Sequence, residues 1–270
     1  MPLTQEQQEA VRMGTPIEWN GLTLFPILMK DYNRFIIAQM GLTAQQQTLP
    51  SKYVVMRYLE ALYALDYDVR TNGGPQGGFF SRILLFLMLS LRLEVRKGLD
   101  GEEYIPIGIQ TEKENPRKLT ALEVTQGEVS VEITPQNFVQ LREILAAQNE
   151  VELPDETLNA ELVQAERDLA TKSSLNLVPD SEALIYSVSV KTQIPVEDIF
   201  QWTVRRFVLT ERAIDRITGH LVAALSEAAG AKYKNGNPWP SWKYDRDKHS
   251  SALVSLAELT QRLSGSVEAR

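Results

Sequence analysis

The chain lacks several of the residues on which functional sites commonly depend. Its 270 residues include no cysteine and only two histidines. The missing cysteine excludes disulfides, thiolate zinc sites, thiol redox motifs and a cysteine nucleophile. Basic residues are also few, with 28 Lys+Arg against 35 Asp+Glu. A general nucleic-acid-binding protein usually carries a basic excess, so we expect no binding to nucleic acid.

Long apolar runs are missing as well. The longest run, Ile83 to Leu89, lies between Arg82 and Ser90, whereas a membrane-spanning helix needs about 20 apolar residues. We therefore expect a buried core helix at this point and no membrane association. The first residues, up to Val11, are polar and rich in Gln and Glu, without the basic start and apolar centre of a signal peptide. A location in the cytoplasm follows as the expectation.

What remains is the composition of an ordinary globular protein, with 43% hydrophobic and 23% charged residues. The pattern along the chain predicts an α+β fold in three parts. Residues 1–130 form a small mixed N-terminal domain with β-hairpins, and residues 131–230 form an all-helical domain. Residues 231–270 form an extended, aromatic and Pro-rich C-terminal strap with a short helix at its end.

The N-terminal part carries two hairpin signals. Alternating apolar residues from Ile17 to Leu24 flank Asn20-Gly21, the pair that suits a type I′ turn because both central residues need positive φ. A second β region covers residues 104–133, with a turn at Gln126-Gly127. Apolar spacing predicts helices over Leu28 to Met40, Ser51 to Asp66 and Phe79 to about Leu93.

The central part carries helix-start signals. Thr134-Pro135 places a capping hydroxyl before a proline at the first helical position, and we expect this helix to run to Gln148. The further predicted helices run from Asp155 or Asn159 to Thr171, from Asp180 past Val188, from Ile194-Pro195 through Trp202 to Phe207, and from Thr210 to Ala229, with Gly230 just beyond the last helix.

Catalytic and metal-binding patterns are weak. Asp245-x-Asp247-x-His249 lies among Lys243, Arg246 and Lys248, whose charges oppose a cation, and His220 has no acidic neighbour in sequence. The chain has no G-x-S-x-G motif. The glycine-rich loop at residues 73–78 precedes a helix and could present N–H groups to an anion, but we interpret it as a connector. The sequence predicts no enzyme, no catalytic residue, no cofactor and no metal.

Residues 187–207 resemble helix-turn-helix spacing, with Arg205 and Arg206 in the second helix. Recognition helices read bases with their N-terminal residues, and here those positions are Glu197 and Asp198, which repel phosphate. We therefore interpret the segment as a plain helical hairpin.

Two further features bear on partners. The segment from Arg142 to Glu182 contains ten acidic and three basic residues. This composition indicates a solvated face or, alternatively, a binding surface for a basic partner. Residues 233–244 combine Tyr and Trp with proline and glycine. We interpret this segment first as a strap packed on its own domain. The alternatives are an anchor for a protein partner and a stacking platform for nucleic acid.

Several ordered segments together resemble one family. They are Ile133-Thr134-Pro135, Gln148-Asn149, Pro154-Asp155-Glu156, Leu158-Asn159, Glu161-Leu162, Trp202 to Phe207, Ala213-Ile214-Asp215 and Gly236 to Arg246. The pattern is similar to proteins encoded in the tail modules of phages of Gram-positive bacteria. It covers about residues 135–246, and Leu24 to Tyr32 more loosely. It departs at Ala160, where the family leads us to expect proline.

The resemblance implies a non-enzymatic tail assembly chaperone-like protein, because such genes lie beside the tape-measure gene. Its expected partner is the phage tape-measure protein or another tail protein, met in the host cytoplasm. The alternative is a structural component of the virion in the tail, neck or baseplate, and self-association stays open. The candidate partner-binding residues are Trp202, Arg205, Arg206, Trp239, Trp242 and Tyr244.

Overall fold

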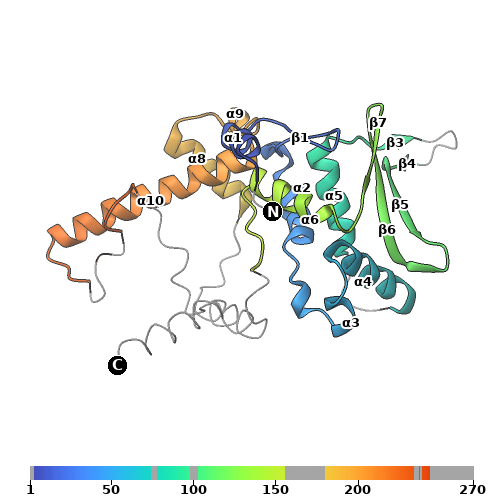
Figure 1. Cartoon of the computed structure of the whole chain (residues 1–270). Helices are drawn as coiled ribbons and strands as arrows, with labels where there is room; N and C mark the ends of the chain where they lie inside the picture. The colour runs from blue at the N-terminus through green and yellow to red at the C-terminus, as the bar shows by residue number, and fades with distance from the viewer. Residues whose placement is uncertain are drawn as a thin grey trace, which may run out of the picture. The chain divides into compact units, whose positions relative to one another are not determined.

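The computed structural model describes residues 3–73, 78–97, 103–155, 180–233, 237 and 239–243. It has the mixed α+β character that the sequence predicts (Figure 1). Two compact units can be distinguished. Unit 1 comprises Met1–Pro154 together with Phe200–Arg206, and unit 2 comprises Asp155–Ile199 together with Phe207–Arg270.

Unit 1 contains all the described strands and most of the described helices. Its elements are α1 (Gln5–Met13), β1 (Ile17–Trp19), β2 (Leu22–Leu24), the 3-10 turn η1 (Met29–Asp31), α2 (Tyr32–Leu42), η2 (Gln46–Thr48), α3 (Ser51–Val54), α4 (Tyr58–Asn72), α5 (Phe79–Leu91), β3 (Arg96–Lys97), β4 (Glu103–Tyr104), β5 (Ile107–Glu112), β6 (Asn115–Gln126), β7 (Val129–Ile133) and α6 (Phe138–Gln148). In unit 2 the described elements are α8 (Ser181–Thr192) and α9 (Val196–Ile199). Helix α10 (Val204–Ala228) begins in the last residues of unit 1 and continues through unit 2.

The β1–β2 hairpin confirms the first turn prediction. Asn20 and Gly21 have φ values of 49° and 89°, as a type I′ turn requires. The register pairs Ile17 with Leu24 and Trp19 with Leu22. All four of these apolar side chains are buried, so the alternating pattern of the sequence points into the core.

A three-stranded antiparallel sheet in the order β5-β6-β7 forms the second β region, and β3 and β4 form a separate hairpin. Gln126 pairs with Val129 at the β6–β7 turn, where Gly127 has a φ of 62°, so this turn prediction is also confirmed. Helix α4 packs against β6 (Figure 1).

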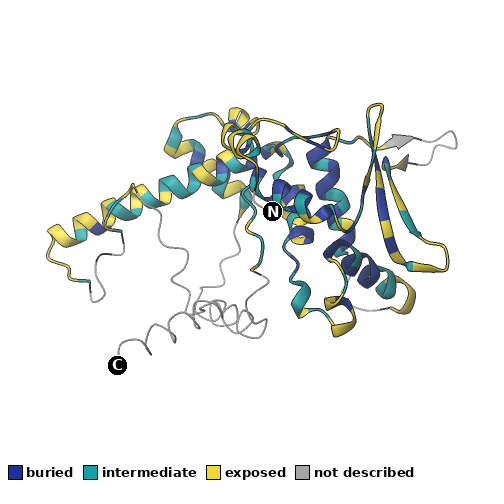
Figure 2. Ribbon diagram, viewed as in Figure 1, coloured by how far each residue is buried: buried dark blue, intermediate teal, exposed yellow. Residues whose placement is uncertain are grey.

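The core of unit 1 is a set of closely packed helices. Gly41 of α2 lies so near α5 that a Cβ atom there would be 2.7 Å from Ile83 N, which is why a residue without a side chain is needed. The apolar helix α5 buries Ile83, Phe86 and Leu87 completely, and Figure 2 shows much of this helix as buried. It is therefore a core helix, and none of the described helices is long and apolar enough to cross a membrane.

Helix α6 lies in unit 1, although the sequence places it in the helical part that begins at residue 131. Its residues Phe138, Leu141, Ile144 and Leu145 are completely buried. The side-chain amides of Gln148 and Asn149 form hydrogen bonds to the backbone at the end of the β1–β2 hairpin and just after it. Gln148 Nε2 donates to Leu24 O over 3.0 Å, and Asn149 Oδ1 accepts from Ile27 N over 2.9 Å. These contacts attach α6 to unit 1.

Two helix predictions need correction. The helix expected over Ser51 to Asp66 is interrupted after α3, because Gln46 Nε2 donates to the backbone oxygens of Tyr53 (2.9 Å) and Met56 (2.6 Å). These carbonyl groups then need no helical partner, and Arg57 adopts an extended conformation before α4. Helix α1 was not expected at all, although Thr4 and Gln7 form a complete capping box at its start.

The helix expected from Ile194-Pro195 to Phe207 is also wrong. Helix α9 covers one turn. The chain then passes through a turn and a single β-bridge, Leu28 to Thr203, because residues 200–204 pair with the backbone near Leu28. Met29 N donates to Trp202 O over 2.9 Å, and Val204 N donates to Ile27 O over 2.8 Å. Helix α10 starts only after this pairing. The expected separate helix from Thr210 is part of it.

Two helix-end predictions in unit 2 are confirmed. Asp180 caps α8, with Oδ1 accepting from Glu182 N over 2.9 Å. Gly230 has a φ of 91° after α10, and the N–H groups of Gly230 and Ala231 each donate over 2.9 Å to Glu227 O and Ser226 O. This pair of bonds is a Schellman motif. The helix predicted up to Thr171 lies mostly outside the described residues, as does the helix after the strap.

Candidate protein-binding surface

Large apolar side chains are exposed along the C-terminal half of α10. Ile217, Leu221, Val222 and Leu225 are 46%, 56%, 57% and 71% exposed, and Figure 2 shows this part of the helix mainly as exposed or intermediate. With about 3.6 residues per turn, Ile217, Leu221 and Leu225 lie one above another on one side, and Val222 lies beside them. We call these four residues the α10 apolar surface.

The same side of α10 is buried nearer its start. Phe207 is 1% exposed, and Ile214, between Phe207 and the α10 apolar surface, is partly exposed. The apolar row therefore continues from the packed part of the helix into solvent. Contiguous exposed apolar patches can mark interaction sites, whereas single exposed apolar residues need no explanation.

The opposite side of α10 receives the strap. A Cβ atom on Gly219 would lie 2.6 Å from Cε2 of Trp239, so the indole ring rests directly on the helix backbone. His220 Nδ1 lies 2.9 Å from Trp239 O, and Trp239 N donates to Asn237 Oδ1 over 2.7 Å. Ala223, one turn from Gly219, is 2% exposed. The described part of the strap thus packs on its own helix.

The predicted partner-binding residues fall into two separate groups. Trp202, Arg205 and Arg206 belong to unit 1 and make contacts within it. Trp202 is 7% exposed, the Arg206 guanidinium lies 4.1 Å from the centre of its ring, and Arg205 forms an ion pair with Glu150. These three residues stabilise the entry into α10.

The second group belongs to the strap of unit 2. Trp239 contacts α10, whereas Trp242 is 51% exposed. Tyr244 lies outside the described residues, as do Asp245, Asp247 and His249 of the pattern weighed for metal binding. Most of the acidic stretch, residues 156–179, also lies outside them.

An anion at the glycine-rich loop would bind the N–H groups at the start of α5. Asp66 of α4 is 7% exposed, and its carboxylate accepts from Gly78 N over 2.8 Å and from Phe80 N over 3.0 Å. The N–H groups that could have held a phosphate therefore bind the protein's own carboxylate. The rest of this loop, residues 74–77, lies outside the described part.

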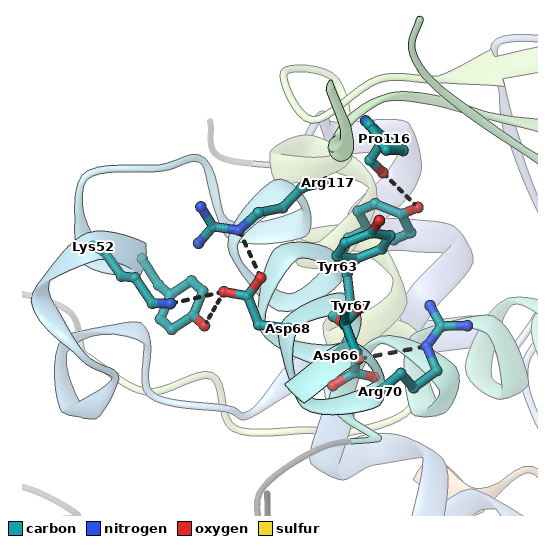
Figure 3. A network of polar contacts seen from close by, with 10 residues as sticks. Lys52, Tyr63, Asp66, Tyr67, Asp68, Arg70, Pro116 and Arg117 are labelled. Atoms are coloured by element: carbon teal, nitrogen blue, oxygen red, sulfur yellow. Dashed lines mark hydrogen bonds and ion pairs between the residues drawn. The ribbon is translucent and has the colours of Figure 1, made fainter. Parts of the chain in front are cut away.

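A second carboxylate of α4 holds three donors (Figure 3). Asp68 accepts from Lys52 Nζ over 2.8 Å and from the Tyr53 hydroxyl over 2.7 Å, and it lies 2.9 Å from Arg117 Nε. Burial raises the pKa of Asp68, but the bonds from Lys52 and Tyr53 and the charge of Arg117 outweigh it, so the pKa lies below its usual value. A carboxylate engaged in this way stabilises structure and is a poor general base.

Unit 1 also has one described cleft of note, with a volume of about 300 Å³. Apolar residues form much of its wall, and charged residues of both signs stand around it. The lining residues are Pro26, Ile27, Leu28, Lys30, Asp31, Arg34, Met88, Leu89, Arg92, Leu93 and Glu94. Among the described residues, no three His, Asp or Glu side chains are grouped so that they could hold a metal ion.

Comparison with known proteins finds no matching family model, no matching curated protein and no matching solved structure. The resemblance to phage tail-module proteins therefore stays a prediction.

The sequence contains a signal for the α10 apolar surface, but this signal does not predict that the surface is exposed. Ile214, Ile217, Leu221 and Leu225 recur at intervals of three and four residues in a segment predicted as helix, but such spacing equally describes a helix packed in a core. Only the structure separates the buried start of the row from its exposed end.

Proposed function

We propose that this protein is a non-enzymatic tail assembly chaperone-like protein that binds the tape-measure protein in the host cytoplasm. The observation that carries the proposal is the α10 apolar surface, with four large aliphatic side chains, each about half exposed or more. The resemblance of residues 135–246 to phage tail-module proteins supports the choice of partner.

Such a surface can cover an apolar stripe on a partner. The resemblance implies a tape-measure partner that is a long helical chain with apolar stripes. A stripe left in water before assembly would promote aggregation. An amphipathic helix in a partner recognises such a stripe through anchors at three- and four-residue spacing, and α10 presents its apolar residues at this spacing.

The modest size of the surface suits a transient role. Stable interfaces bury about 800 Å² on each partner, and four half-exposed aliphatic side chains supply roughly half of that area. A chaperone has to release its partner when the tail is built, so we expect a complex that forms and dissociates during assembly.

Co-expression with the tape-measure protein encoded beside its gene tests the proposal. We expect a soluble complex with the unaltered protein and loss of that complex with Leu221→Gln/Leu225→Gln. Val55→Gln, at an 87% exposed position of unit 1, is the matched control and should leave the complex intact.

If the tape-measure protein is equally soluble alone and no complex forms at low salt, the chaperone proposal is wrong. The composition of purified virions then decides the alternative. A chaperone is absent from them, whereas a structural component of the tail, neck or baseplate is present in a fixed copy number.

A further inference from the structure

The two edges of the α10 apolar surface differ in the residues that share a row with them. Positions four, seven and eleven residues apart share one row of an α-helix. On one edge, such a row contains Glu211, Asp215, Thr218 and Val222. On the other edge, the row contains Ala213, Ile217, His220 and Ala224. One edge is therefore acidic and the other carries small or apolar residues and a histidine.

The acidic edge is unfavourable for the helix by itself. Glu211 and Asp215 are four residues apart, and like charges at this spacing destabilise a helix. Asp215 is exposed and Glu211 is partly exposed, so both carboxylates are accessible to a partner. A cation supplied from outside would relieve their repulsion as it formed an ion pair.

The basic residues of this part of α10 lie on a different side. Arg212 and Arg216 share a row with Gly219 and Ala223, and this row is the side on which Trp239 rests. Between Glu211 and Arg216 the charges around α10 are thus divided, with bases on the side of the strap and acids on the side of the α10 apolar surface.

We propose that the segment bound by the α10 apolar surface is an amphipathic helix with Lys or Arg along one edge of its apolar seam. This inference rests on the proposed function and specifies the chemistry of its partner. The seam packs on Ile217, Leu221 and Leu225, and the basic edge lies along Glu211 and Asp215. The alanines of the opposite edge allow large apolar side chains of the partner to approach closely.

A second copy of this chain fits the surface less well. In an antiparallel, two-fold symmetric pair the same edges face each other, so the row of Glu211 and Asp215 lies against the same acidic row of the second copy. In a parallel pair this row meets the row of Ala213, His220 and Ala224, which contains no Lys or Arg. Neither arrangement supplies a lysine or arginine to the acidic edge.

Two synthetic peptides of about 20 residues, long enough to form helix, test the inference on the full-length protein. Both carry the same Leu and Ile seam, and one has Lys and the other Glu along one edge. Fluorescence anisotropy at low salt measures each affinity. We expect the Lys peptide to bind roughly five- to ten-fold more tightly, as two exposed charge pairs would give, and the difference to shrink in high salt.

Charge reversal identifies the edge. Glu211→Lys/Asp215→Lys should reverse the preference, so that the Glu peptide binds more tightly. Glu197→Lys/Asp198→Lys in α9 makes the same change in net charge within unit 2 and should leave the preference as it was. Leu221→Gln/Leu225→Gln should weaken both peptides.

Equal affinities of the two peptides, no binding of either, or a preference unaffected by Glu211→Lys/Asp215→Lys would overturn the inference. So would sedimentation showing a dimer that Leu221→Gln separates, because a second copy would then cover the surface. If the charge preference is found but the tape-measure protein is not bound, the proposed function fails alone. If Leu221→Gln/Leu225→Gln releases the tape-measure protein but the peptides show no charge preference, this inference fails alone.

Discussion

Gln126 and Thr23 form a reciprocal pair of hydrogen bonds between two different sheets. Thr23 N donates to Gln126 Oε1 over 2.8 Å, and Gln126 Nε2 donates back to Thr23 O over 2.9 Å. The same Nε2 also donates to Leu91 O over 2.9 Å. The side-chain amide of Gln126 thus forms with β2 the two hydrogen bonds that a residue of a neighbouring strand would form. It also joins the end of β6 to the end of α5.

We expect Gln126→Ala to lower the free energy of unfolding by about 1–2 kcal/mol, because it leaves partly buried backbone groups without partners. Gln126→Glu should be at least as harmful, because a carboxylate oxygen would then face two carbonyl oxygens. Urea denaturation measures both. Gln110→Ala is the control, since Gln110 contacts the exposed carboxylates of Glu123 and Glu132 at 3.4 Å, and its loss should change stability little.

The Asp68 network predicts a pH dependence of stability. The pKa of Asp68 in the folded protein lies below its usual value, so its stabilising effect is complete above the unfolded pKa of about 4. The effect disappears as the pH falls through the folded pKa. Asp68→Asn should therefore lower Tm at pH 7 and have a much smaller effect near pH 2.

Melting curves over this range, with Asp31→Asn as the control, measure the Asp68 effect. Asp31 pairs with Arg34 at 3.6 Å on the surface, and such exposed pairs contribute about 0–1 kcal/mol. A Tm difference for Asp68→Asn that stays constant down to pH 2 would show that ionisation of Asp68 is not its cause.

Gly219→Ala should separate the strap from α10. In a helix interior this change usually stabilises by about 0.5–1 kcal/mol, but here the new Cβ would lie 2.6 Å from the Trp239 ring. We expect the tryptophan emission to shift toward longer wavelength as the ring leaves the helix. The shift should be absent when Gly219→Ala is made in a Trp239→Phe background. Trp242→Ala should leave Tm nearly unchanged, since half of this side chain is exposed.

Glu150 combines a strained backbone with an ion pair. Its φ is 56°, and its carboxylate pairs with Arg205. Glu150→Ala should cost about 1 kcal/mol more than Glu150→Gly, because both lose the pair but alanine keeps the left-handed penalty. Chemical denaturation of the two variants gives the difference. Equal stabilities would mean that the backbone relaxes at this position.

Arg205 and Arg206 already have partners within unit 1, so we expect no binding to duplex DNA at physiological salt. A gel shift tests this. Tight, salt-dependent binding that Arg205→Ala and Arg206→Ala abolish would contradict it and revive the helix-turn-helix interpretation of residues 187–207.

Local signals in the sequence predicted those parts of the fold that local chemistry decides. Asn20-Gly21 specifies its turn through φ, Asp180 supplies a cap for α8, and the length of the apolar run limits α5 to a core helix. The capping box of Thr4 and Gln7 is equally local, and this pattern alone could have predicted α1.

The remaining features depend on residues far apart in the chain. The break before α4 requires the amide of Gln46, and the non-helical segment before α10 requires the backbone of Ile27 and Met29. Neither contact can be predicted from the helical periodicity of the sequence. The candidate surface depends in the same way on burial, because Phe207 and Leu225 belong to one apolar row and only their surroundings distinguish them.

The return of residues 200–206 to unit 1 has a consequence for synthesis on the ribosome. Residues 1–154 emerge first, but the segment that pairs with Ile27 and Met29 follows only after residues 155–199. At about 5–20 residues per second, residues 200–206 are synthesised roughly 3–10 s after residue 154. During that interval Met29 N and Ile27 O lack the partners that they have in the finished fold. Folding of unit 1 is therefore completed only after most of the chain has been translated.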